Sequence, residues 1–294
     1  MSRLWSSPIL LLLVVGTLLG ASLPLGKLAA NAGLPPILWA LVISSGAAAV
    51  LGLVLAARGQ LRLADGHRLR YFAVTATVSY AIPNLLLFTV IPKVGAGYAG
   101  IMFTLSPIIT LLFSLVFGVR RPNGLGVAGI AIGFFGALLV ALSRGGLVQP
   151  APLAWVLAAL LIPVSLATGN IYRTLDWPKD AGPIELAVGS NAMAALFLFV
   201  LLLISGGGAA ISKLASVPVL TVIQMATAAG MFAVFFRLQA VGGPVYLSQI
   251  GYVAAAVGLL AGVAAFGEHY PLLTWAGVAL ITAGVTLTTR AQAA

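Results

Sequence analysis

Apolar runs of about 20 residues recur along almost the whole chain, and each is long enough to cross the hydrocarbon core of a bilayer as a helix. Proline, glycine, asparagine and charged residues separate the runs. The runs are apolar on every side rather than alternating in character, which predicts helices and not the strands of a β-barrel. Ten transmembrane helices are predicted, at residues 8–30, 34–56, 69–91, 96–118, 123–143, 152–174, 183–205, 217–240, 243–266 and 270–289.

Composition supports this class and excludes several others. Of the 294 residues 61% are hydrophobic and only 7% are charged, whereas a soluble domain carries about 25% charged residues. A soluble enzyme and a disordered chain are therefore both excluded. The absence of cysteine removes disulfides, thiolate metal sites and cysteine nucleophiles. The net charge of +10 comes from scattered residues rather than from one basic face, so we expect no nucleic-acid partner.

The distribution of lysine and arginine predicts the orientation of the helices, because cytoplasmic loops are enriched in both. With the N-terminus inside, the outer loops hold Lys27, Lys93, Arg144 and Lys213. The other eleven cations, Arg173 among them, are assigned to the cytoplasmic side. Both termini are therefore predicted to be cytoplasmic. The first run predicts a retained helix rather than a signal peptide, since nine similar runs follow it. The five tryptophans lie near run ends and are interpreted as interfacial anchors.

The chain matches itself weakly at an offset of 148 residues. The matched pairs are Pro35 and Pro183, Gly95 and Gly243, Tyr98 and Tyr246, Gly129 and Gly277, and Gly136 and Gly284. The match predicts two five-helix repeats, residues 1–148 and 149–294. Since five is odd, the second repeat must be inverted in the membrane, an arrangement typical of secondary transporters with a central site. The glycines of the fifth and tenth runs predict close helix packing at the periphery of the bundle.

Several motifs resemble one transporter family. The segment from Phe266 to Pro271 reads Phe-Gly-Glu-His-Tyr-Pro, and Trp275 to Val285 follows it with glycines at 277 and 284. Together with Leu105-Ser106-Pro107 and Gly20-Ala21-Ser22, these segments resemble the EamA-type members of the drug/metabolite transporter superfamily. The chain is most similar to the YddG-like exporters of aromatic amino acids. The resemblance implies export of small metabolites from the cytoplasm across a bacterial inner membrane.

Polar residues inside the predicted helices indicate which faces line an interior cavity, because an unsatisfied polar group in hydrocarbon costs several kcal/mol. Spacings of three or four residues place several of them on shared helix faces. Tyrosine rings, a methionine and neutral amides suit a ligand with an apolar body and a few hydrogen-bonding groups. A role in gluing helices together is the alternative for each residue. The predicted substrate-binding residues are Tyr80, Asn84, Tyr98, Met102, Ser165, Thr168, Asn170, Gln224, Tyr246 and Gln249.

Prolines inside four of the runs are candidates for gating hinges, with simple packing kinks as the alternative. These are Pro24, Pro83, Pro107 and Pro163. All five carboxylates lie in loops or at run ends, so a proton relay through a central acid has no obvious carrier. We expect alternating access driven by the substrate gradient, with no catalytic residues, no metal site and no cofactor.

The sequence thus predicts an all-α polytopic membrane protein, with two inverted repeats around a central cavity. The predicted function is export of small, largely neutral metabolites, above all aromatic or large neutral amino acids. Export of drugs or other amphipathic metabolites is the main alternative; a channel and a sugar-nucleotide or phosphate carrier are favoured less. The last class needs several interior arginines or lysines, and the middles of the runs contain none. The expected partners are the substrate and membrane lipids, and a monomer is expected.

Overall fold

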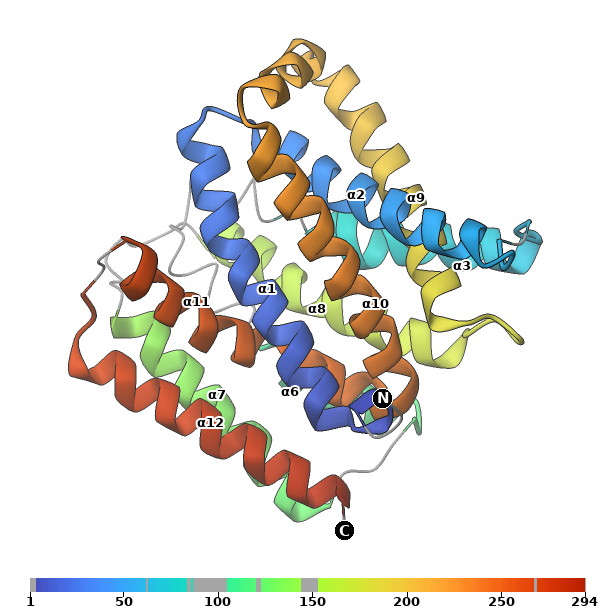
Figure 1. The fold of residues 1–294 in the computed structure, drawn as a ribbon. Coiled ribbons are helices and arrows are strands. Elements are labelled where there is room, and N and C mark those ends of the chain that lie inside the picture. The colour runs from blue at the N-terminus through green and yellow to red at the C-terminus, as the bar shows by residue number, and fades with distance from the viewer. Residues whose placement is uncertain are drawn as a thin grey trace.

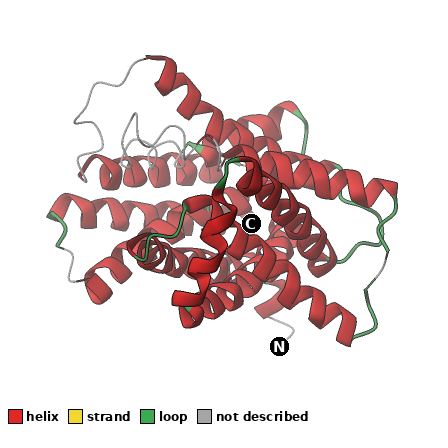
Figure 2. Ribbon diagram, turned by 90° about the horizontal axis from the view of Figure 1, so that it is seen from above, coloured by secondary structure: helices red, strands yellow, loops and turns green. Residues whose placement is uncertain are grey.

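The structure is a computed structural model that describes residues 4–61, 63–83, 86, 105–119, 123–143, 153–266 and 269–293. Within these residues every regular element is a helix (Figure 2). The elements are η1 (Leu4–Ser6), α1 (Pro8–Asn31), α2 (Pro36–Ala57), α3 (Gly66–Thr75), η2 (Ala76–Ala81), α6 (Ser106–Val116), α7 (Gly124–Ser143), α8 (Leu153–Leu175), α9 (Pro183–Ile204), η3 (Gly207–Ser216), α10 (Pro218–Ser248), α11 (Ile250–Phe266) and α12 (Leu272–Ala293).

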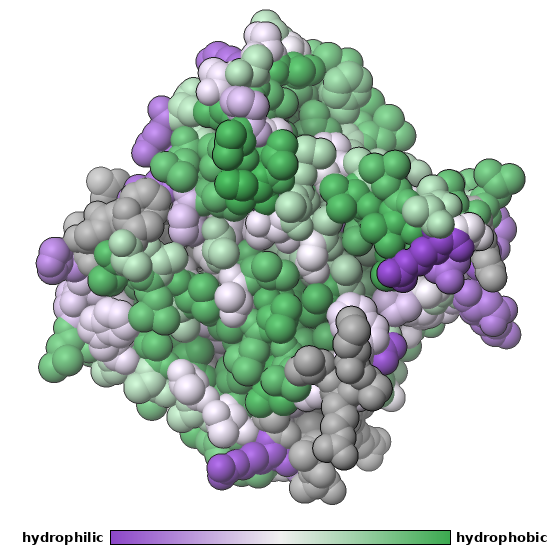
Figure 3. Space-filling view, in the orientation of Figure 1, coloured by the Kyte–Doolittle hydropathy of each residue, from purple (hydrophilic) through white to green (hydrophobic). Residues whose placement is uncertain are grey.

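The outer surface of the bundle is as apolar as a protein that faces lipid requires. Four of the described helices, α1, α2, α9 and α10, are long and apolar enough to cross a membrane. Large hydrophobic side chains project from them, including Leu53 at 70% exposure and Ile204 at 78%. The space-filling view shows broad hydrophobic areas over the face formed by α1 and α10 (Figure 3). Polar side chains, by contrast, are found inside: Asn191 and Gln224 are almost completely buried.

The helix bounds follow the predicted runs closely for α1, α2, α7, α8, α9 and α12. The division predicted between residues 240 and 243 corresponds to a break within α10, which runs from Pro218 to Ser248. It is kinked at Gly243, whose φ of 72° and ψ of −175° lie in a region that only glycine adopts readily. Pro244 follows, and α11 begins at Ile250.

Helices of the first half of the chain pack mainly against helices of the second half (Figure 1). The main pairs are α1 with α10 and α11, α2 with α9 and α10, α6 with α8, and α7 with α12. The 148-residue offset makes α1 the counterpart of α8, α2 of α9, α3 with η2 of α10, α6 of α11, and α7 of α12. When each helix is replaced by its counterpart, the contact α1–α11 becomes α8–α6, and α1–α10 becomes α8–η2. In the same way α2–α10 becomes α9–α3 and α9–η2, and all of these contacts are present. The two halves therefore interlock rather than forming separate lobes.

The α7–α12 pair shows why small residues are needed there. A Cβ atom added at Gly136 would lie 2.6 Å from the carbonyl oxygen of Gly277, and one added at Gly284 would lie 2.6 Å from that of Gly129. These two contacts exchange with each other under the 148-residue offset. Backbone-to-backbone contact of this kind excludes any larger side chain and replaces the hydrophobic effect, which is absent between helices in lipid.

Loop contacts divide into two groups at opposite ends of the bundle. At one end Lys213 Nζ donates to the carbonyl of Gly33 at 3.2 Å, which joins the α1–α2 turn to η3. At the other end Asn123 Nδ2 donates to the carbonyl of Ala291 at 3.0 Å, and Arg70 of α3 bonds to Asp176, which follows α8. This grouping agrees with the alternation of loops that the apolar runs predict.

Candidate functional site

A cavity of about 310 Å³ opens among α1, α2, η2 and α10. Its volume is at the lower end of the range for small-molecule sites, about 300–1,000 Å³. It lies where α1 ends and α2 begins, at the end of the bundle opposite the α2–α3 loop. Most of its lining is apolar. The lining residues are Gly26, Ala29, Ala30, Leu34, Pro36, Trp39, Ala40, Ile43, Ser44, Tyr80 and Phe232.

Two aromatic residues of the lining carry buried polar atoms without a partner. Trp39 Nε1 and the Tyr80 hydroxyl are buried and have no hydrogen-bond partner among the described residues. The Tyr80 ring packs edge-on against Phe232, with centroids 5.4 Å apart at 86°. A buried donor without a partner is destabilising by about 1–3 kcal/mol. Because both atoms are buried, the side chains must shift before these atoms can bind a ligand in the cavity.

A π-helical turn, η2, holds Tyr80 in place. The backbone N–H of Ile82 bonds to the carbonyl of Thr77, the i→i+5 spacing of a π-helix. The widened turn leaves the carbonyl of Val78 free to accept a hydrogen bond from Ser165 Oγ of α8 at 2.7 Å. Single π-turns occur often at functional sites because they redirect neighbouring side chains. Here Tyr80 lines the cavity, while the adjacent Ser79 contacts α8.

Below this turn the guanidinium of Arg173 is buried, with 1% of the residue exposed. Nη1 donates to Ser79 Oγ, Nη2 to Asn170 Oδ1 at 2.6 Å, and Nε to Gln239 Oε1 at 3.4 Å. The charge also lies over the Phe235 ring, 5.0 Å from its centroid. These five residues are called the Arg173 cluster below.

Further hydrogen bonds orient the neutral members of the cluster. Gln239 Nε2 donates to Thr174 Oγ1 at 2.6 Å and to the carbonyl of Asn170 at 3.2 Å. Asn170 Nδ2 donates to Thr110 Oγ1 of α6 at 3.3 Å. The Gln239 and Asn170 amide oxygens are therefore turned towards Arg173, and α6, α8, η2 and α10 all contribute to holding this cation.

Arg173 was counted among the cations of the cytoplasmic side, and that count did not anticipate that its side chain is buried. Arg173 is in the last turn of α8, as the sequence predicts, but its side chain points into the bundle instead of reaching water. Its neighbours explain the difference, since Ser79 and Gln239 supply acceptors from two other helices. The middles of the predicted runs contain no arginine or lysine, but the end of α8 brings the cation of Arg173 into the buried interior.

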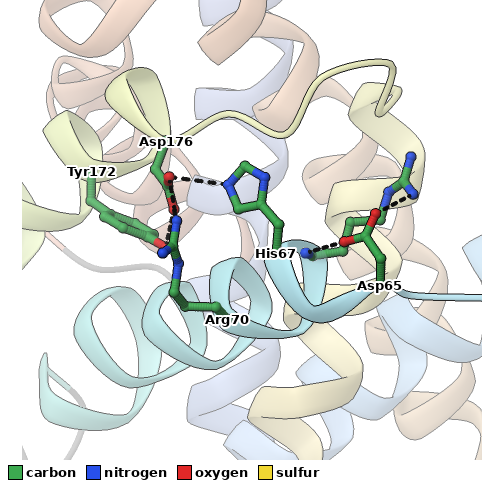
Figure 4. A network of polar contacts seen from close by, with 6 residues as sticks. Asp65, His67, Arg70, Tyr172 and Asp176 are labelled. Carbon is green, nitrogen blue, oxygen red and sulfur yellow. Dashed lines mark hydrogen bonds and ion pairs between the residues drawn. The ribbon is translucent and has the colours of Figure 1, made fainter.

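A second polar group, which is partly exposed, lies at the same end of the bundle and is called the α3–α8 network (Figure 4). Asp176 follows α8 and accepts from Tyr172 Oη at 2.6 Å and from Arg70 Nη2 at 2.8 Å. His67 Nε2 lies 3.1 Å from the same carboxylate. Arg68 pairs with Asp65 at 3.0 Å on α3 and with Glu185 of α9 at 2.8 Å.

Hydrogen bonds and charges in this network lower the pKa of two of its acids, Asp176 and Asp65. Burial raises the pKa of Asp176, but hydrogen bonds from Tyr172 and His67 and the charge of Arg70 outweigh it, so the pKa lies below its ordinary value. The backbone N–H of Arg68 donates to Asp65, which caps α3, and this bond is the main cause of the lowered pKa of Asp65. Both carboxylates are therefore ionised at neutral pH and paired with cations.

The predicted substrate residues are not gathered in one chamber. Tyr80 lines the cavity, Ser165 and Asn170 are buried on α8 next to η2, and Gln224 is buried on α10 with Nε2 3.5 Å from Ser22 Oγ of α1. Thr168 is exposed and bonds to the carbonyl of Val164 within its own helix. The remaining described members, Tyr246 and Gln249, are buried where α10 meets α11. The predicted Asn84, Tyr98 and Met102 lie outside the described residues.

The predicted hinges also differ in their placement. Pro24 and Pro163 are inside α1 and α8, where a missing backbone donor can kink the helix. Pro83 follows η2 closely. Pro107 instead lies in the first turn of α6, a position that tolerates proline because its N–H has no helical partner in any case.

Two candidate functional residues, Trp39 and Arg173, were not predicted from the sequence. Trp39, interpreted as an interfacial anchor, is 8% exposed and lines the cavity. The three-residue spacing of Asn170 and Arg173 places them on one face of α8, and this was the available signal for the buried cation.

The comparisons with known proteins agree with the membrane assignment. Residues 6–142 match the EamA-like transporter family. Three Escherichia coli proteins, from strains K12, O6:H1 and O157:H7, carry the name "uncharacterized inner membrane transporter YedA" and are 29% identical to this chain over 210 residues. Each match takes in 67% of this chain and 63% of the relative, so the chain spans less than two thirds of the length of these relatives.

A solved structure supports the fold beyond the EamA-like segment. It is a crystal structure that superposes with a TM-score of 0.76 over 97% of this chain and 99% of its own. At 20% sequence identity this likeness shows a shared fold. It extends over both halves of the chain, whereas the EamA-like match covers the first.

Proposed function

We propose that this protein is an inner-membrane transporter that exports small amphipathic metabolites, with aromatic and large neutral amino acids as the preferred cargo, by alternating access. The cavity carries the proposal, because its apolar walls and unpaired Trp39 and Tyr80 donors suit a ligand with a large apolar body and few polar groups. The EamA-like segment and the transporter names of the relatives support the same class of function.

The helix pairing supports alternating access between two inverted five-helix repeats, residues 1–148 and 149–294. Each main pair across the halves has a counterpart under exchange of the repeats, which is the arrangement expected of inverted repeats related by a pseudo-two-fold axis. The aromatic pair Tyr80–Phe232 closes the cavity on the side of the Arg173 cluster. If both termini are cytoplasmic, as the cation distribution predicts, the cavity faces outwards in this conformation.

Uptake of labelled amino acids into proteoliposomes, with competition by each of the twenty, tests this function. We expect saturable uptake with phenylalanine, tyrosine, tryptophan and large aliphatic amino acids as the strongest competitors. Tyr80→Ala should reduce uptake, and the predicted site residue Tyr246 can be tested in the same way. Competition by unrelated amphipathic drugs but not by amino acids would favour the drug exporter instead. Uptake that requires an imposed proton gradient would contradict transport driven by the substrate gradient alone.

A further inference from the structure

The charge of Arg173 has no counter-ion among the described residues. Every hydrogen bond of its guanidinium goes to a neutral oxygen, on Ser79, Asn170 or Gln239. A buried cation is strongly unfavourable unless an anion or several hydrogen bonds compensate it. The neutral acceptors satisfy three of its five N–H groups, and they leave the net charge in place.

The acids of the protein are engaged elsewhere. Of the four carboxylates in the described part of the chain, Asp65, Asp176 and Glu185 form ion pairs with residues of α3. Asp180 is exposed in the loop that precedes α9. None of the four pairs with Arg173, although the α3–α8 network begins only one helical turn away, at Asp176. Arg68 and Arg70 of α3 are thus paired with carboxylates, whereas the buried Arg173 is not.

The Arg173 cluster shares a wall with the cavity. Ser79, which holds Nη1, is adjacent in sequence to Tyr80, which lines the cavity. On α10, Phe235 under the guanidinium is one turn from Phe232, the other aromatic residue of the cavity wall. The Tyr80 hydroxyl also lies within electrostatic range of Arg173. The edge-to-face pair of Tyr80 and Phe232 is thus the partition between an apolar chamber and an uncompensated cation.

We propose that Arg173 is the specificity-determining residue that binds a carboxylate on the transported molecule. The inference rests on the proposed function in taking the cavity as the cargo site. An arginine fork binds a carboxylate through two parallel hydrogen bonds, and two N–H groups remain for this purpose. The apolar body of the cargo occupies the chamber, its carboxylate reaches Arg173 when Tyr80 and Phe232 separate, and the unpaired Tyr80 hydroxyl donates a further hydrogen bond.

The site has no described acid that could bind the amino group of a cargo. No described carboxylate lies in the cavity wall or in the Arg173 cluster, so the described site offers no counter-ion for an ammonium group. The cargo class is therefore a carboxylic acid with an apolar body, and amino acids qualify by their carboxylate rather than by their amine. An amide of the same shape, which lacks the negative charge, is excluded.

Ligand-induced thermal stabilisation of the purified full chain tests this directly. The probes are 3-phenylpropanoate and its amide, 3-phenylpropanamide, which match in shape and differ in charge. We expect the acid to raise the unfolding temperature saturably and the amide to leave it unchanged. In Arg173→Gln the concentration of acid needed for half of the shift should rise at least tenfold. Arg237→Gln is the matched control, since Arg237 bonds to the carbonyl of Trp5 at the surface of the bundle, and it should respond as the unmodified protein does.

Equal stabilisation by acid and amide, no stabilisation by the acid, or an unaltered response in Arg173→Gln would each overturn the proposal. If Arg173→Gln does not fold, the contrast between acid and amide in the unmodified protein still decides whether binding requires the carboxylate charge. Arg173→Lys, which keeps the charge but not the fork, should then give a weaker response. The proposed function fails separately: acid binding without transport of phenylalanine would contradict the transporter, whereas transport that the amide inhibits as well as the acid does would contradict only the role of Arg173.

Discussion

The α3–α8 network and the Arg173 cluster lie within a few residues of each other on α8. The cations of the network are paired with carboxylates, whereas the cation of the cluster is not. In the network, which is partly exposed, Asp176 is paired with Arg70 and lies beside His67. In the cluster, which is buried, a cation is surrounded by neutral oxygens and an aromatic ring. Exposed ion pairs contribute about 0–1 kcal/mol and need no functional explanation. A buried cation without a counter-ion is expensive to maintain, and sites that sacrifice stability in this way are typically functional.

The largest effect is expected when the missing counter-ion of Arg173 is supplied. Asn170→Asp replaces an amide by a carboxylate of the same shape, 2.6 Å from Arg173 Nη2. We expect the unfolding temperature to stay level or rise. The same exchange at Asn191, which is fully buried on α9 with no cation among its described contacts, should lower the free energy of unfolding by about 3 kcal/mol or more. Chemical denaturation in detergent measures both, and equal destabilisation by the two substitutions would contradict an uncompensated Arg173.

The internal carboxylate should also displace the ligand. In Asn170→Asp, Arg173 is already neutralised, so the affinity for 3-phenylpropanoate should fall at least tenfold, or about 1.4 kcal/mol. Titration by isothermal calorimetry measures this loss. Unchanged affinity in a folded Asn170→Asp protein would show that the carboxylate binds elsewhere.

A smaller loss of cargo affinity is expected from a change at Tyr80, which lines the cavity. Tyr80→Phe removes one hydroxyl that has no partner in the described protein. We expect cargo affinity to fall about threefold to tenfold, the value of one hydrogen bond of 0.5–1.5 kcal/mol, with no loss of stability. If Tyr80→Phe destabilises the protein markedly instead, the hydroxyl serves the fold rather than the ligand.

The α3–α8 network should respond least. Arg70→Ala and Asp176→Asn should each change the free energy of unfolding by about 1 kcal/mol or less, and the effect should shrink as salt is added. A double-mutant cycle in low and high salt isolates the pair. A coupling well above 1 kcal/mol that salt does not alter would mean that this network is as structural as the buried cluster.

The contribution of Asp176 to the stability of the fold should decrease at acid pH. The pKa of Asp176 is lowered in the folded protein from its model-compound value of 3.8, so its ionised form stabilises the fold. This contribution is complete above about pH 4 and is lost as the pH falls through the lower, folded-state pKa. Unfolding temperatures between pH 3 and 6 should show the difference between the unmodified protein and Asp176→Asn narrowing at the acid end. A difference that widens there would contradict the assigned pairing.

The sequence predicts the helices well because the length of an apolar run is a property of the chain alone. α2 and α9 begin within two residues of their predicted starts, each at a proline. The glycines of α7 and α12 likewise predict a close contact that the structure contains. The partner helix could not be predicted from them, because a small-residue stripe on one helix fits any other with a complementary surface.

The site was predicted less completely, because side-chain direction depends on neighbouring helices. Tyr80 was predicted to bind substrate because it is polar inside an apolar run, and it lines the cavity described above. Arg173 was counted only as a cation of the cytoplasmic side, and its buried position depends on acceptors on η2, α8 and α10. Thr168 satisfies its hydroxyl within α8 and can face outwards, so polarity alone did not indicate its face.

Inhibition of phenylalanine uptake by the matched acid and amide tests whether Arg173 binds the carboxylate of the cargo. In proteoliposomes that contain the unmodified protein, we expect saturable uptake of labelled phenylalanine, which 3-phenylpropanoate inhibits at least tenfold more strongly than 3-phenylpropanamide. Arg173→Gln should abolish that difference, while Arg237→Gln should retain it. Equal inhibition by the two compounds in the unmodified protein, or uptake in Arg173→Gln that keeps the preference for the acid, would contradict a carboxylate site at Arg173.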